Sequence, residues 1–178
     1  MTNQNILLKF TAKNDFRFHL EHICKNGNYL YATDGAICVR MADDGSEPTP
    51  LQGDVHTEKL SKYIDDWLEK ESENQNLSPL VFDVPRRVEC LNCDEDGLIH
   101  EGDRCYTCGD CDGSKLVYPE RAQSLCGKNF QTKYIAKLSK LPNIKFGLSQ
   151  NCGRDGMAYF TFDGGQGVLM HTGRTAYC

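Results

Sequence analysis

The chain has no apolar run near the ~18–20 residues that a membrane-spanning helix needs, which excludes a helical membrane protein. Its start, MTNQN, has neither basic residues nor an apolar segment, so we expect no secretory signal and a cytoplasmic protein. Basic residues are in the minority, with 20 Lys and Arg against 25 Asp and Glu. The net charge of −5 argues against a general nucleic-acid coat but leaves room for one local basic patch.

The sequence also lacks the short motifs of common enzyme classes. It contains no G-x-S-x-G, H-E-x-x-H, Walker A or G-x-G-x-x-G pattern. A Gly-rich segment, residues 163–167, is predicted to lie between two strands, whereas phosphate-binding loops connect a strand to a helix. We therefore predict a protein without enzymatic activity.

Cysteine, by contrast, is plentiful, and five of the 10 cysteines fall within residues 90–111. In a chain without signs of secretion, such a cluster indicates metal-binding or free thiols in a reducing compartment. Two CxxC pairs, Cys90/Cys93 and Cys108/Cys111, can bring four thiolates around one ion. The spacing predicts one structural zinc ion, because four protein ligands leave no open position for catalysis.

Two other residues compete for a place in this site. Cys105 forms a further CxxC with Cys108, and His100 is a weaker candidate ligand. We favour Cys108 with Cys111 because an Asp-Gly turn follows that pair, as it does in zinc knuckles. The Asp- and Gly-containing segments after both pairs resemble the C-x-x-C-x-G-x-G repeat of DnaJ-type chaperones, although neither pair matches it in full. The remaining cysteines are predicted to be small packed hydrophobes: Cys24, Cys38, Cys126, Cys152 and Cys178.

Hydrophobic periodicity predicts an α+β fold in which a helix followed by strands occurs twice, after residues 57 and 130. Helices are expected at residues 15–25, 57–70 and 130–141. Strands are expected at residues 5–12, 29–33, 36–41, 80–84, 115–118, 144–149, 157–162 and 167–171.

Local signals refine this prediction at three points. Asp34-Gly35 is predicted to form a hairpin turn, and Thr57 the N-cap of its helix. The polar face of helix 57–70, which carries Asp65, Asp66 and Glu69, is predicted to be solvated.

Three lysines form a row along one side of the helix predicted at residues 130–141. Lys133, Lys137 and Lys140 recur at i, i+4 and i+7, beside the apolar stripe. Two interpretations remain open. The row is either an ordinary solvated face or a surface for sequence-independent contact with the phosphates of duplex DNA, which requires only aligned positive charge.

Several segments resemble the bacterial DNA polymerase III β sliding clamp. FQTKYIAKLSKLP at residues 130–142, IKFGL at 144–148, DGMAYF at 155–160 and GVLMHTGR at 167–174 are similar to the last helix and strands of that family. NYLYATDGA at 28–36 is similar to its recurring L-x-[LV]-x-A-T-D-G strand. The family's G-V-[IL]-M-P-M-R ending differs here, because HTG replaces its Pro-Met segment.

The resemblance implies a β-rich domain with an antiparallel sheet and two helices on one face, expected to be those at 57–70 and 130–141. In clamps these helices line the DNA channel, which would give the lysine row a role. The implied clamp-like domain is discontinuous, residues 1–85 and 127–178, with a zinc-binding insertion at 86–126. Clamps carry three such domains per chain, so a ring would require a homo-oligomer.

These observations favour a non-enzymatic DNA-replication accessory that binds DNA, a polymerase or a similar protein. The alternative is a phage-type interaction or inhibitor protein that uses the same scaffold to bind a host protein. A zinc ribbon that binds nucleic acid by itself is disfavoured, since residues 86–118 carry eight acidic and four basic side chains.

Overall fold

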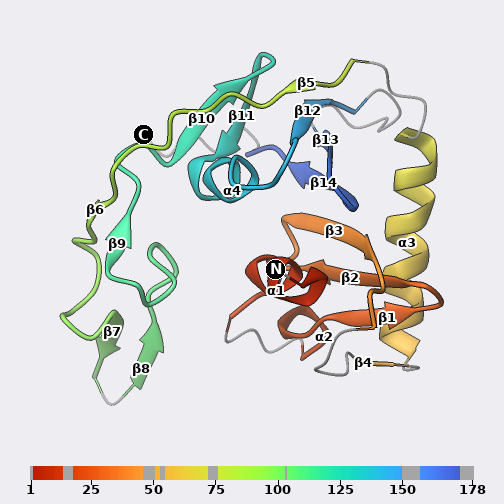
Figure 1. Cartoon of the computed structure of the whole chain (residues 1–178). Helices are drawn as coiled ribbons and strands as arrows, with labels where there is room; N and C mark the ends of the chain where they lie inside the picture. Colours follow the sequence, from red (N-terminus) through yellow and green to blue (C-terminus); the bar gives the residue numbers. More distant parts are fainter. Residues whose placement is uncertain are drawn as a thin grey trace.

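An eight-stranded sheet organises the computed structural model, which describes residues 2–13, 18–45, 51–52, 55–71, 76–102, 104–149 and 157–172 (Figure 1). From edge to edge its strands are β4 (Leu51–Gln52), β1 (Cys24–Asn26), β2 (Tyr29–Thr33), β3 (Ile37–Ala42), β14 (Gly165–Met170), β13 (Met157–Phe162), β12 (Lys145–Leu148) and β5 (Ser78–Pro79). Neighbouring strands are antiparallel except β1 and β4. The mixed α+β class with a large antiparallel sheet is therefore confirmed.

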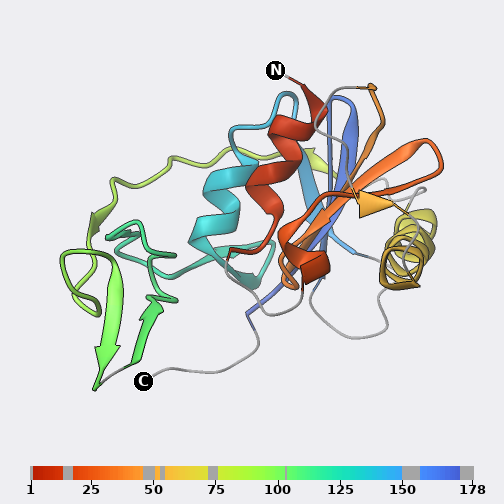
Figure 2. The same ribbon diagram turned by 90° about the horizontal axis from the view of Figure 1, so that it is seen from below.

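Helices cover both faces of this sheet (Figure 2). The first face carries α1 (Asn3–Leu7), which continues into a 3₁₀ turn (Leu8–Phe10), and α4 (Thr132–Leu138). The opposite face carries α3 (Val55–Glu71). Two helices do share a face, but the expected pairing of helices 57–70 and 130–141 is wrong. The strands are apolar on both sides, so each side needs a helical cover.

The central six strands consist of two similar halves. In the first half α1 precedes β1, β2 and β3, and in the second half α4 precedes β12, β13 and β14. The halves join where β3 pairs with β14, with Val39 opposite Gly167. The helix that corresponds to α4 is therefore α1, and not the predicted helix at residues 57–70.

The N-terminal segment is helical, so the strand predicted at residues 5–12 is wrong. The Thr2 hydroxyl caps α1 by accepting a hydrogen bond from the backbone N–H of Asn5. Ile6, Leu7 and Phe10 are buried together, whereas the neighbouring Leu8 is 48% exposed. This spacing of one, three and four residues matches a helix face and not the alternation of a strand.

Residues 80–84 do not form the predicted strand. The regular pairing is limited to β5, where Pro79 has no N–H to extend a ladder. Leu80 and Phe82 nevertheless pack against the main core. The backbone N–H of Leu80 donates to the carbonyl oxygen of Ile144 at 3.1 Å, which ties this segment to the sheet.

Other predicted elements are present with shifted ends. In the described part of the first predicted helix, α2 spans Phe18–Glu21, and the helix ends before residue 25 because β1 begins at Cys24. Thr57 is not the N-cap, since α3 begins at Val55. The hairpin around Asp34-Gly35 is confirmed, as is β13.

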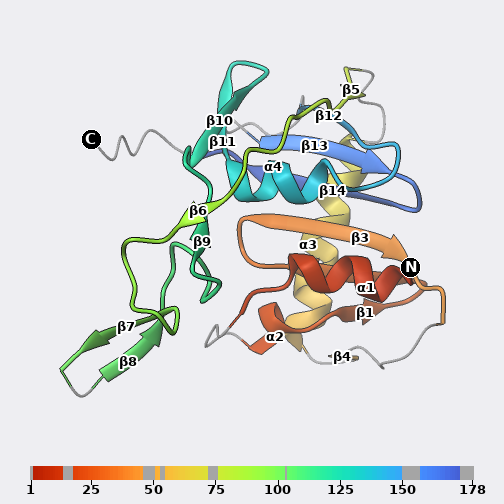
Figure 3. The same ribbon diagram turned by 60° about the vertical axis from the view of Figure 1, so that its left-hand side comes forward.

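The cysteine-rich region forms an arm that extends from the sheet (Figures 1 and 3). This arm, residues 86–118, contains two short ladders and a small core of its own. Its strands are β6 (Val88–Glu89) with β9 (Leu116–Val117), and β7 (Leu98–Glu101) with β8 (Arg104–Thr107). A hairpin of β10 (Ala122–Leu125) and β11 (Lys128–Gln131) connects the arm to α4. Among the described residues, no helix is both long and apolar enough to cross a membrane.

Candidate metal centre

The arm brings four cysteine sulfur atoms together. The Sγ atoms of Cys90, Cys93, Cys108 and Cys111 all lie within 4.8 Å of one another. Two of the separations, Cys90–Cys108 and Cys93–Cys111, are 3.8 and 3.6 Å. A tetrahedron with Zn–S bonds of ~2.3 Å has edges of about 3.8 Å, so the four atoms have the spacing of a tetrahedral thiolate site.

Two glycines allow the two CxxC turns to approach closely. Gly97 and Gly113 both have positive φ, and each follows one of the cysteine pairs. A Cβ atom on Gly97 would lie 2.4 Å from the carbonyl oxygen of Gly113, a backbone atom that cannot rotate away. The carbonyl oxygen of Gly97 in turn accepts the backbone N–H of Cys108 at 3.1 Å. The Gly-containing segments after both pairs therefore set the distance between the turns.

The cysteine cluster is largely shielded from solvent. Cys108 is fully buried, and Cys90 and Cys111 are nearly so. Burial, followed by the adjacent thiols, raises the pKa of Cys93. Four thiolates at these distances repel one another, so a bound cation is needed for all four to be deprotonated.

The two competing residues lie outside this cluster. Cys105 is exposed on β8, directly opposite His100 of β7 in the ladder register. His100 Nε2 lies 3.0 Å from a carboxylate oxygen of Asp96, and the imidazole is half exposed. The four cysteines that the structure brings together are those favoured on the basis of the Asp-Gly turn after Cys111.

The three scattered cysteines that the structure describes differ in their exposure to solvent. Cys24 is fully buried, and Cys38 is half-buried with its Sγ donating to the Thr33 hydroxyl at 3.2 Å. Burial raises the pKa of Cys38 to about 11, so its thiol stays protonated. Cys126 was expected to be packed, but it is exposed in the turn between β10 and β11, with a φ of 52°. Cys152 and Cys178 lie outside the described residues.

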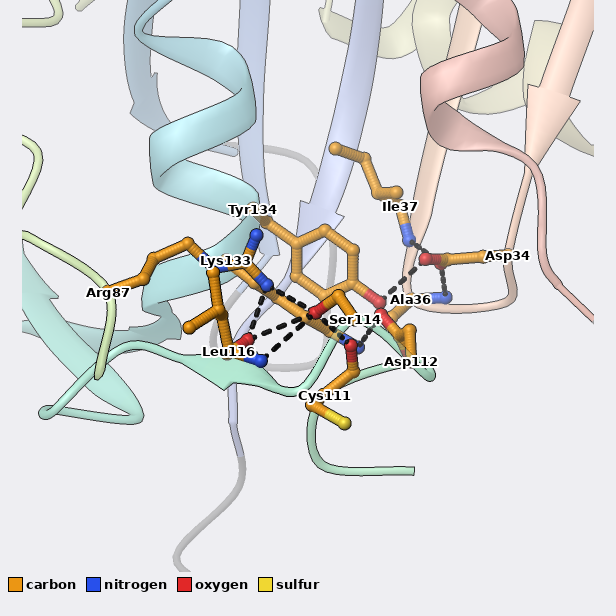
Figure 4. Close-up of polar contacts among 10 residues, drawn as sticks. All are labelled: Asp34, Ala36, Ile37, Arg87, Cys111, Asp112, Ser114, Leu116, Lys133 and Tyr134. Atoms are coloured by element: carbon orange, nitrogen blue, oxygen red, sulfur yellow. Dashed lines mark hydrogen bonds and ion pairs between the residues drawn. The ribbon is translucent and has the colours of Figure 1, made fainter. Parts of the chain in front are cut away.

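The lysine row is partly engaged by the arm (Figure 4). Lys133 forms an ion pair with Asp112, with Nζ 3.6 Å from the carboxylate oxygen. The Nζ atoms of Lys133 and Lys137 lie 5.3 and 5.5 Å from the ring centroid of Tyr134. Lys140 is exposed and follows the end of α4. The three lysines therefore differ in environment.

Burial changes the pKa of the middle lysine. It lowers the pKa of Lys137, and the nearby ammonium groups of Lys133 and Lys13 act in the same direction. The carboxylates of Asp34 and Asp112 oppose this effect. Three cations and two anions are thus close enough to influence one another at the junction of α4 and the arm.

A second polar contact links α4 to the β2–β3 hairpin. The Tyr134 hydroxyl donates to Asp34 Oδ2 at 2.7 Å. The other oxygen of Asp34 accepts the backbone N–H groups of Ala36 and Ile37, at 3.0 and 3.2 Å. Asp34 therefore connects the hairpin turn to the helix. The prediction of a turn at Asp34-Gly35 did not include this contact with α4.

The base of the arm is fixed by a guanidinium group. The Nη2 atom of Arg87 donates to the Ser114 hydroxyl at 2.6 Å and also to the carbonyl oxygen of Leu116. A further ion pair joins Arg121 to Asp110 at 3.1 Å. The Arg87 contacts stabilise the base of the arm, and the ion pair of Lys133 with Asp112 connects the turn after Cys111 to α4.

Replacing Tyr134 with phenylalanine should destabilise the protein by about 2 kcal/mol, because a hydrogen bond to a charged group is lost. Urea denaturation followed by circular dichroism measures this change. Tyr118→Phe is the control, since the Arg87 guanidinium lies over its ring and that contact survives the substitution. Equal stability of the two variants would show that the contact with Asp34 contributes nothing.

Comparison with known proteins gives a structural similarity but no match in sequence. The sequence matches no protein-family model and no curated protein. Its fold is similar to a crystal structure of the DNA polymerase sliding clamp from Bacillus subtilis, with 12% sequence identity and a TM-score of 0.41. The match covers 98% of this chain and 62% of that chain, so the protein spans less than two thirds of the clamp's length.

Proposed function

We propose that the four clustered cysteines hold one structural zinc ion, and that the chain is a non-enzymatic, clamp-like accessory of DNA replication. In this proposal it acts by binding DNA or a polymerase-like protein. The observation that carries the proposal is the pair of helices, α1 and α4, on one face of an antiparallel sheet, with lysines beside α4. The resemblance to sliding clamps implied two helices on one face of such a sheet, although the helix expected beside α4 was the one at residues 57–70 and not α1.

The donor set and its spacing support zinc. Four soft thiolates in a tetrahedron suit Zn²⁺ or an iron centre, and an all-thiolate site leaves no position for a substrate or water. The ion would connect the two CxxC turns of an arm that has little other core. Its role would therefore be to fold the arm.

The arm fits within the insertion expected at residues 86–126. Its small core is separate from the main one, which supports an inserted unit. Leu125 packs against the main core, so we assign the β10–β11 hairpin to the body. We propose that the clamp-like domain comprises the rest of the chain and that a ring would need several copies.

Contact with duplex DNA can be tested through salt dependence. Lys140→Gln should weaken binding and reduce the slope of log K against log salt by about one, because one phosphate contact is lost. Fluorescence anisotropy with labelled duplex DNA at several salt concentrations measures the slope. Lys62→Gln is the matched control, since Lys62 is exposed on α3 at the opposite face of the sheet. Identical slopes for both variants would contradict DNA contact through this face.

Two of the three lysines in the row already have contacts within the protein. This favours the second candidate, an interaction protein that binds a host protein. Lys133 is already paired with Asp112, and Lys137 is half-buried. A null result with DNA, together with a specific partner recovered from host lysate, would select this candidate. Light scattering would show whether either activity depends on a homo-oligomer.

A further inference from the structure

Exposed apolar side chains gather on the cysteine arm. Leu91, between Cys90 and Cys93, is 91% exposed, the highest value among the large hydrophobic side chains of the described residues. Val88, Tyr106 and Leu116 of the same arm are also exposed. Burying such side chains against a partner is favourable, and their concentration on a small projecting unit indicates an interaction surface.

A groove lies beside Leu91 on this arm. It has a volume of about 290 Å³ and runs between the first CxxC turn and β7, with Leu91, Cys93 and Ile99 among its lining residues. Pockets that enclose a whole small ligand usually have volumes of ~300–1,000 Å³. The groove lies at the lower limit of this range and has room for one or two side chains of a partner.

Negative charge borders the same groove. Asp94 lines it and its side chain is 70% exposed, while the adjacent Glu95 is also exposed. Asp96 is already used, since it accepts the backbone N–H of Leu98 and contacts His100. Asp94 Oδ2 also lies 3.9 Å from His100 Nε2, but its side chain is more exposed than that of Asp96, so Asp94 and Glu95 are the more accessible carboxylates at this groove.

We propose that this groove binds an extended segment of another protein, with an apolar side chain placed beside Leu91 and a lysine or arginine facing Asp94 and Glu95. Charge complementarity selects this occupant. The phosphates of nucleic acids and the headgroups of anionic membranes would be repelled by the same carboxylates. A second copy would bring another acidic arm, because residues 86–118 contain eight acidic and four basic side chains. The site is separate from the α1/α4 face and goes beyond the contact proposed there.

Fluorescence anisotropy with the full-length protein, purified in the presence of zinc, tests the proposal. The probe is a labelled synthetic peptide of alternating leucine and arginine, and the matched peptide carries glutamate in place of arginine. We expect the arginine peptide to bind and its affinity to fall with added salt, and the glutamate peptide not to bind.

Substitutions then locate the binding site. Leu91→Ser should weaken binding of the arginine peptide by about tenfold, as expected for loss of a central anchor. Asp94→Asn combined with Glu95→Gln should weaken it by about threefold and flatten the salt dependence. Val81→Ser is the control, since Val81 is 88% exposed but lies outside the arm. Zinc content and thermal unfolding should be unchanged in all these variants.

The proposal is overturned if neither peptide binds, if both bind equally, or if Leu91→Ser and Val81→Ser behave alike. Sedimentation velocity provides a separate outcome. Self-association that disappears in Leu91→Ser would identify a second copy of the chain as the occupant and would also overturn the proposal.

Discussion

Replacing Cys108 with serine should reduce the bound zinc from one ion per chain to almost none and unfold the arm. Cys108 is fully buried, and its Sγ lies 3.8 Å from that of Cys90. Structural zinc sites contribute ~10–16 kcal/mol of apparent binding energy in small peptides, and such units are unfolded without the metal. Elemental analysis gives the zinc content, and NMR spectra report which residues lose their structure.

The matched control is Cys105→Ser, which changes the neighbouring CxxC cysteine on an exposed strand. It should retain zinc and a folded arm. The main sheet should stay folded in both variants, because the arm and the body have separate cores. Retention of zinc by Cys108→Ser, or its loss from Cys105→Ser, would show that another quartet binds the metal.

The second large effect is expected for Asp65→Ala. This substitution should lower the free energy of unfolding by about 3 kcal/mol. The Asp65 carboxylate accepts the Tyr31 hydroxyl at 2.8 and 3.1 Å and pairs with an Arg40 Nη1 atom at 2.6 Å. Tyr31 is only 1% exposed. Removal of the carboxylate therefore leaves a buried hydroxyl and a largely buried guanidinium without their partner.

The neighbouring Asp66 is the control for this substitution. It is exposed on the same helix, so Asp66→Ala should change stability by no more than about 0.5 kcal/mol. Chemical denaturation of both variants gives the comparison. Asp65→Asn should fall between them, because it retains an acceptor for Tyr31 but loses the charge that pairs with Arg40. Equal stability of the two alanine variants would contradict the structural role of Asp65.

Asp65 also illustrates what sequence patterns cannot reveal. Its position on the polar stripe of an amphipathic helix predicted a solvated side chain. In the structure that edge of the stripe faces Tyr31 and Arg40 on two strands from another part of the sequence. Periodicity identifies the apolar side of a helix, but which polar residue meets a buried partner depends on tertiary packing.

The clustering of the four cysteines was easier to predict, because CxxC spacing is local and the turn after Cys111 is encoded by adjacent residues. The placement of α3 was harder. Both helices predicted to share a face have a similar apolar stripe, and nothing in either stripe specifies the side of the sheet. The helix that does share a face with α4 was missed, because α1 is only five residues long and was interpreted as a strand.

The pairing of β3 with β14 governs the order in which the protein can fold during synthesis. Val39 emerges from the ribosome long before Gly167, its partner in the sheet. The β2–β3 hairpin can form early, but the outer edge of β3 then has unpaired backbone groups until β14 has been made. An open strand edge is a template for pairing with other chains. The arm and α3, which are encoded between the two halves, lengthen the time for which the nascent protein must keep that edge from aggregation.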